Sequence, residues 1–159
     1  ALAFSVAPRH AGELAACALR LVQGETLDVL SEGAEPDAAT LDFIHRHKTG
    51  ALIESSCRIG AAEAGGDVAA AGRYGAALGL AFQIHDDVLD ETSDAATLGK
   101  TAGADRAAGK LTYPAVHGLG ASILKAAQAR DEAVFALRGW PGDVSFLTEL
   151  AHFAVSRDR

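Results

Sequence analysis

The sequence predicts an all-α protein, a bundle of helices in a single domain. Apolar residues recur mostly at the three- and four-residue spacing of helices, and no segment shows the sustained alternation that is typical of a strand. Alanine is abundant, only 6% of the residues are aromatic and there are only four prolines. Such a composition favours helices that pack closely on small side chains. A chain of 159 residues is long enough to bury a core of its own.

Turn residues divide the chain into six expected helices. The segment 31–37 carries Gly33 and Pro36, and a proline favours the first turn of the helix that follows it. Two adjacent glycines precede the third helix, and the turn 139–142 separates the last two. The helices are expected at about 10–29, 36–58, 67–90, 114–119, 122–137 and 141–156.

Charge and composition exclude several functions. The net charge is −7, and no basic stripe is present that could neutralise the phosphates of a nucleic acid. No stretch approaches the roughly 20 apolar residues that a membrane span needs. Cys17 and Cys57 are isolated, so we expect buried thiols in a reducing, cytoplasmic compartment and no zinc site. An acidic pocket can still take a phosphorylated molecule when a divalent metal inverts the local field.

The third expected helix carries three carboxylates on one arc. With Asp86 at zero, Asp90 falls about 40°, Gln83 about 60° and Asp87 about 100° around the helix. Most of the remaining circumference is apolar, so the helix is expected to be buried, where carboxylates repel each other unless a cation is present. Oxygen ligands select Mg²⁺ or Mn²⁺ over zinc. The alternative is a solvated acidic patch at a helix end.

The same arc holds small residues further up the helix, namely Gly72, Ala76 and Gly79. A glycine inside a helix costs about 1 kcal/mol relative to alanine, so a reason for keeping this space clear is expected. Two interpretations remain open: room for an apolar ligand, or close packing against a neighbouring helix.

Lysines next to glycines form a second group of candidate residues. Lys100 and Lys110 each follow a glycine in the segment 91–111, which is rich in glycine and threonine, and Lys48 and Thr49 precede Gly50 in the second helix. Glycine lets the backbone approach a ligand closely, and lysine offers a point charge to phosphate. Taken alone, each of Lys100 and Lys110 is better explained as a solvated surface charge.

Together these residues resemble one family, the trans-isoprenyl diphosphate synthases. The run 82–90 (FQIHDDVLD) is similar to the family's second aspartate-rich motif, and the bacterial farnesyl and geranyl diphosphate synthases look nearest. The other matching segments are 24–28, 48–50, 98–100, 103–105, 109–114 and 156–159. The resemblance implies a helical bundle of the isoprenoid synthase type, of which residues 1–159 are the C-terminal portion.

The resemblance also implies a reaction, the condensation of an allylic diphosphate with isopentenyl diphosphate, and a homodimer. Magnesium ions would be held by Asp86, Asp87 and Asp90, and the departing diphosphate would be stabilised by Lys48, Lys100 and Lys110. Thr49 and Gln83 would lie near the allylic carbons. The three residues expected to be catalytic are Lys48, Lys100 and Asp86. The family's first aspartate-rich motif has no counterpart in this sequence, so we expect the chain alone to be inactive.

Two other classes of protein use related sequences. A non-catalytic subunit related to these synthases typically loses one aspartate motif, whereas the second motif is intact here. A class I terpene cyclase also uses DDxxD, but the segment from Gly99 to Pro114 favours the chain-elongating family.

Overall fold

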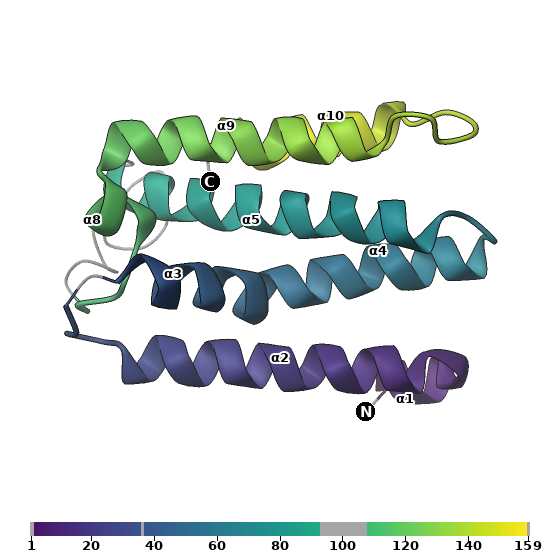
Figure 1. Cartoon of the computed structure of the whole chain (residues 1–159), viewed down its shortest axis with the longest axis horizontal. Helices are drawn as coiled ribbons and strands as arrows, with labels where there is room; N and C mark the ends of the chain where they lie inside the picture. The colour runs from purple at the N-terminus through teal and green to yellow at the C-terminus, as the bar shows by residue number, and fades with distance from the viewer. Residues whose placement is uncertain (1, 36, 93–107, 159) are drawn as a thin grey trace.

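The computed structural model describes residues 2–35, 37–92 and 108–158, and every regular element in them is helical. Four long helices lie side by side and run in alternating directions: α2 (Ala11–Leu30), α4 (Ala51–Glu63), α5 (Val68–Thr92) and α9 (Leu119–Ala136) (Figure 1). The shorter elements are α1 (Leu2–Val6), η1 (Pro8–His10), α3 (Ala38–His45), η2 (Arg46–Gly50), α8 (Tyr113–His117) and α10 (Ser145–Ala154). The prediction of an all-α bundle is confirmed.

The second expected helix is divided into three elements. Asp37 caps α3 by accepting hydrogen bonds from Ala39 N and Thr40 N, and the π-helical turn η2 then joins α3 to α4. Gly50 ends this turn, and a Cβ on it would lie 3.0 Å from His45 O. A π-turn widens the helix locally, which is common near functional sites. The turn carries Lys48 and Thr49.

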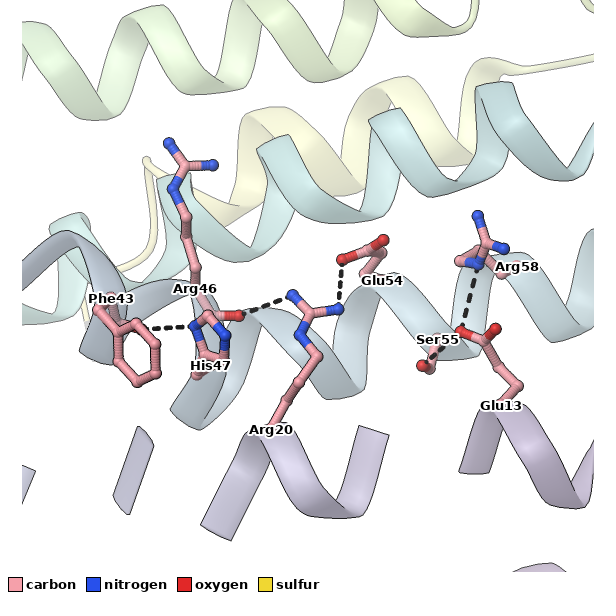
Figure 2. Close-up of polar contacts among 8 residues, drawn as sticks. All are labelled: Glu13, Arg20, Phe43, Arg46, His47, Glu54, Ser55 and Arg58. Atoms are coloured by element: carbon pink, nitrogen blue, oxygen red, sulfur yellow. Dashed lines mark hydrogen bonds and ion pairs between the residues drawn. The ribbon is translucent and has the colours of Figure 1, made fainter. Parts of the chain in front are cut away.

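Polar contacts attach α2 to η2 and α4 (Figure 2). Arg20 donates from Nη1 to Glu54 Oε2 at 2.9 Å and from Nη2 to Arg46 O at 3.4 Å, in the π-turn. Further along, Glu13 Oε1 accepts from Ser55 Oγ at 2.8 Å and from Arg58 Nε at 3.2 Å. These bonds fix the register of α2 against the helix that carries Lys48.

The small-residue arc of α5 packs against another helix. Gly72 and Gly79 are buried, and a Cβ on Gly79 would lie 2.9 Å from the Cα of Gly50. Close packing is therefore the correct one of the two interpretations at the two glycines, whereas Ala76 of the same arc lines a hollow. Without side chains, Gly72 lies close to Arg58 of α4 and Gly79 lies close to Gly50 of η2, so the cost in helix propensity is offset by the close approach.

The core has two clusters, one on each side of the middle of α5. The first contains Ile44 and Ile84 near the predicted site, and the second surrounds Tyr74, whose hydroxyl donates to Leu147 O at 2.8 Å. Within the described ranges, none of the helices is both long and apolar enough to cross a membrane.

Candidate active site

Asp87 is the buried centre of the candidate site. Its Oδ2 accepts a hydrogen bond from Tyr113 N at 2.8 Å and lies 2.9 Å from His45 Nε2. Both His45 and Asp87 are less than a tenth exposed. One carboxylate therefore joins three segments that are far apart in the sequence: the end of α3, the last turns of α5 and the start of α8.

Asp86 precedes Asp87 in the chain, but its side chain lies at the rim of a cavity. Its side chain is 44% exposed, and Arg157 Nη2 lies 3.1 Å from its Oδ1. The 100° turn between consecutive helical residues directs one carboxylate into the core and the other outward.

Lys48 is held by two carboxylates of α2. Its Nζ lies 2.6 Å from Asp28 Oδ2 and 3.0 Å from Glu25 Oε2. Burial alone would lower the pKa of Lys48, but the hydrogen bonds to Asp28 and Glu25 outweigh that effect, and the pKa is raised above its ordinary value. Gly24 makes this approach of α2 and η2 possible, because a Cβ there would lie 2.3 Å from Lys48 N.

Lys110, in the segment before α8, lines the same cavity as Lys48. Gly109 has a φ of 68°, which favours glycine, and its carbonyl accepts a hydrogen bond from Gly33 N at 2.8 Å. This bond holds the lysine next to the end of α2.

These residues surround a polar cavity of about 160 Å³. The charged side chains around it suit a small polar group such as a phosphate. Its lining residues are Asp28, Ile44, His45, Lys48, Gln83, Asp86, Asp87, Lys110, Leu111 and Thr112. Five of the predicted site residues therefore converge on one cavity.

Of the other predicted site residues, the two that the structure describes are not in its lining. Asp90 is buried at 4% exposure, and Thr49 lies in η2. Lys100 lies outside the described residues, as do Gly99, Gly103 and most of the segment 91–111.

A larger hollow of about 810 Å³ lies along α5 and α9, away from these charges. Its floor includes Ala76, Leu80 and Phe135, and Arg73 and Lys125 also line it. None of the predicted charged site residues lines this hollow.

The three aspartates do not form a ready-made metal cluster. In the part of the chain that the structure describes, no three His, Cys, Asp or Glu side chains are arranged to hold an ion. Asp87 Oδ2 already has two partners, whereas Asp86 is partly exposed at the cavity. Magnesium is commonly held by one or two carboxylates together with waters and substrate phosphates. The donor set fits such a shared ion, with Asp86 as the carboxylate at the cavity.

Sequence analysis missed the partners of the predicted residues. Asp28 lies in a segment that resembles the family, but the sequence assigned no role to Asp28 or to His45. Asp28 could have been singled out, because it is a carboxylate four residues after a glycine that a close helix contact requires. The pairing of Arg157 with Asp86 spans 71 residues and had no local signal.

Comparison with known proteins identifies the family. The Polyprenyl synthetase family model matches residues 4–134, most of the chain. The chain belongs to the polyprenyl synthetase family. Farnesyl diphosphate synthase of Escherichia coli is 42% identical over 143 residues, which cover 86% of this chain and 48% of that protein. Geranylgeranyl pyrophosphate synthase 11 of Arabidopsis thaliana is 42% identical over 86% of this chain and 40% of its own length.

Solved polyprenyl synthase structures share the fold. A polyprenyl synthase from Caulobacter crescentus, crystallised with calcium and isoprenyl diphosphate, superposes with a TM-score of 0.87 at 30% identity and covers 95% of this chain. That match covers 60% of the Caulobacter chain. The isoprenoid synthase fold is thus confirmed, and the chain spans about half the length of the curated relatives it matches.

Proposed function

We propose that the protein carrying this chain joins an allylic diphosphate to isopentenyl diphosphate and so makes a longer trans-prenyl diphosphate. The observation that carries the proposal is the cavity at which Lys48, Lys110 and Asp86 converge in a chain that is 42% identical to a farnesyl diphosphate synthase. We further propose that residues 1–159 form the C-terminal part of one isoprenoid synthase domain, because the relatives are about twice as long.

The cavity suits the departing diphosphate. Lys48 keeps its charge through the neutral range, because its pKa is raised, and Lys110 brings a second ammonium to the same space. Positive groups fixed where negative charge develops stabilise the transition state without reorganising. Lys100 is proposed to add a third charge. Mg²⁺, or Mn²⁺, would neutralise part of the diphosphate when held through Asp86, with Asp87 and Asp90 proposed as further members of the motif.

The remaining residues act on the carbon side of the reaction. Gln83 lines the cavity one helical turn before Asp86, and its amide oxygen is proposed to stabilise positive charge on the allylic carbons. Thr49 is proposed to do the same from η2.

The rival functions have less support. The named relatives include farnesyl and geranylgeranyl synthases, which are chain-elongating enzymes, and no terpene cyclase is among those compared above. Residues Asp86 to Asp90 also keep the complete motif that a non-catalytic subunit typically loses.

A homodimer is our proposal for the assembly. Leu19, Val22 and Val29 on α2 are each more than half exposed, and apolar residues at this spacing suit a covered helix face. We also expect a reducing, cytoplasmic compartment, because Cys17 and Cys57 are both free thiols.

The test is prenyl transfer by the full-length protein, measured with radiolabelled isopentenyl diphosphate, geranyl or dimethylallyl diphosphate and Mg²⁺. Asp86→Asn and Lys110→Gln should each lower kcat by about 10²-fold or more. Arg130→Gln, which removes an exposed ion pair with Asp131 on α9, is the control and should change little. Unchanged turnover in the Asp86 variant would rule out the proposed site.

A further inference from the structure

Arg157, in the turn that follows α10, is fixed by three residues of α5. Its guanidinium carbon lies 4.1 Å above the ring of Phe82, its carbonyl oxygen lies 2.9 Å from His85 Nε2, and its Nη2 lies 3.1 Å from Asp86 Oδ1. Positions 82, 85 and 86 share one helix face at i, i+3 and i+4. The chain's last turn is thus docked on the helix that carries the aspartate motif.

The contact leaves part of Asp86 available. It involves one guanidinium nitrogen and Oδ1 alone, and the aspartate side chain remains 44% exposed at the cavity. The Arg157 side chain is only 10% exposed, and its Nε is buried without a hydrogen-bond partner. The guanidinium is therefore held in place by the ring and the backbone contact, and it does not need to leave when a ligand reaches the other oxygen.

A fixed cation beside a carboxylate changes what that carboxylate binds. A free divalent cation at Asp86 would be repelled by Arg157 at short range, in a partly buried place where charges are weakly screened. A complex of one divalent ion with one diphosphate carries net negative charge, so the same guanidinium attracts it. Lys48 and Lys110, which line the same cavity, act in the same direction.

We propose that Arg157 makes Asp86 selective for a metal–diphosphate complex over the free metal ion. The inference rests on the proposed function, because it assumes a diphosphate substrate, and it assigns to the last turn a part in substrate selection. Discrimination here comes mainly from the repulsion of the wrong ligand, which is a common route to specificity. Arg157 acts through Asp86 and is a positioning and specificity residue.

The test measures binding and not turnover. Mn²⁺ binding to the chain is followed by electron paramagnetic resonance, with and without inorganic pyrophosphate, for the unchanged protein, Arg157→Gln and Arg157→Lys. Arg157→Gln should bind free Mn²⁺ about tenfold more tightly, which corresponds to 1.4 kcal/mol, and should bind Mn²⁺–pyrophosphate more weakly. Arg157→Lys keeps the charge. It should prefer Mn²⁺–pyrophosphate over free Mn²⁺ to nearly the same extent as the unchanged protein.

A matched control separates this effect from a general change in charge. Arg9 Nη2 lies 3.1 Å from Glu63 Oε2, the same distance as in the Arg157 pair, but the Arg9 side chain is 82% exposed. It follows α1, at the far end of the bundle from α8 (Figure 1). Arg9→Gln removes the same charge and should leave both Mn²⁺ affinities unchanged. Thermal melting checks that each variant is folded.

Two results would count against these ideas in different ways. If the unchanged chain binds pyrophosphate in a Mn²⁺-dependent manner but Arg157→Gln has the same preference, the inference about Arg157 is wrong and the proposed function stands. If the unchanged chain shows no Mn²⁺-dependent binding of pyrophosphate, the inference about Arg157 is overturned, whereas the proposed function is decided by prenyl transfer in the full-length protein.

Discussion

Two neighbouring aspartates have different physical roles in this structure. The Asp86 side chain is 44% exposed at the cavity, whereas that of Asp87 is 9% exposed and has two hydrogen-bonding neighbours on one oxygen. Sequence analysis gave both the same role, because a pattern such as DDxxD does not show which carboxylate the rest of the fold will bury. The structure assigns the outer position to Asp86.

Asparagine at each position should separate stability from binding. Asp87→Asn turns two charge-assisted contacts, to His45 and to Tyr113 N, into neutral ones and should lower the free energy of unfolding by about 2 kcal/mol. Asp86→Asn keeps an oxygen for Arg157, so it should cost less than about 1 kcal/mol but weaken Mg²⁺-dependent binding of pyrophosphate. Urea unfolding and calorimetry measure the two effects. Equal losses of stability would contradict the assignment.

Tyr74 gives a pH-dependent prediction for the core. Burial, with a smaller effect from Cys57, raises the pKa of Tyr74 to about 12, from an ordinary value of 10.0. Above pH 10 the unfolded chain loses this proton while the folded chain keeps it, so the stability contributed by the neutral phenol falls between pH 10 and 12. The expected loss from this group is about 3 kcal/mol.

Tyr74→Phe removes both the titrating group and the hydrogen bond to Leu147 O. At pH 7 the variant should be about 1 kcal/mol less stable. Its additional loss of stability between pH 9 and 12 should be smaller than that of the unchanged chain. Guanidinium unfolding at the two pH values tests this, and parallel losses would show that the phenol does not titrate as expected.

Several site residues could be predicted from the sequence, and their partners could not. Lys48, Gln83 and Asp86 were found because residue type, neighbouring glycines and helical spacing are local features. Arg157 and His45 lie 71 and 42 residues from the aspartates they contact. Such pairs are set by how helices pack, and one sequence does not record that packing.

At the scale of helices, the sequence predicted the long elements better than their ends. α5 was expected at 67–90 and spans Val68–Thr92, because its apolar pattern is long and regular. The division of 36–58 into α3, η2 and α4 was not predicted. A π-turn adds one residue to a helical turn, which spacing alone does not reveal.

The contact between η2 and α5 can be tested with one of two glycine substitutions, and the other serves as its control. Gly79→Ala would place a Cβ 2.9 Å from the Cα of Gly50, so backbone must move, and a loss of about 2–3 kcal/mol is expected. Gly60→Ala lies in α4 with open space around its Cβ position and should stabilise the protein by about 0.5–1 kcal/mol. Thermal melting of both variants measures the difference. A stabilising Gly79 variant would contradict the packing.

The whole molecule has apolar surface that the described part of the chain leaves uncovered. Leu19 and Val22 on α2 and Phe146 and Phe153 on α10 are each more than half exposed. Large exposed apolar side chains in groups mark surfaces that contact other protein. The curated relatives are about twice as long as the matched region, so they contain further chain that could cover such surfaces.

The last prediction concerns what this chain can do alone. The departing diphosphate must be held on both sides as charge develops, and the sequence contains one aspartate-rich motif, at 86–90. The alignment of two substrates also contributes several kcal/mol to such reactions, and this chain covers only about half of a relative that makes farnesyl diphosphate. We therefore expect no prenyl transfer from the purified 159-residue chain with radiolabelled isopentenyl diphosphate, geranyl diphosphate and Mg²⁺.

A fusion to the part of the Escherichia coli farnesyl synthase that this chain does not match should restore Mg²⁺-dependent product, and Asp86→Asn in that fusion should abolish it. Product formed by the isolated chain would show that the catalytic site is complete within these residues.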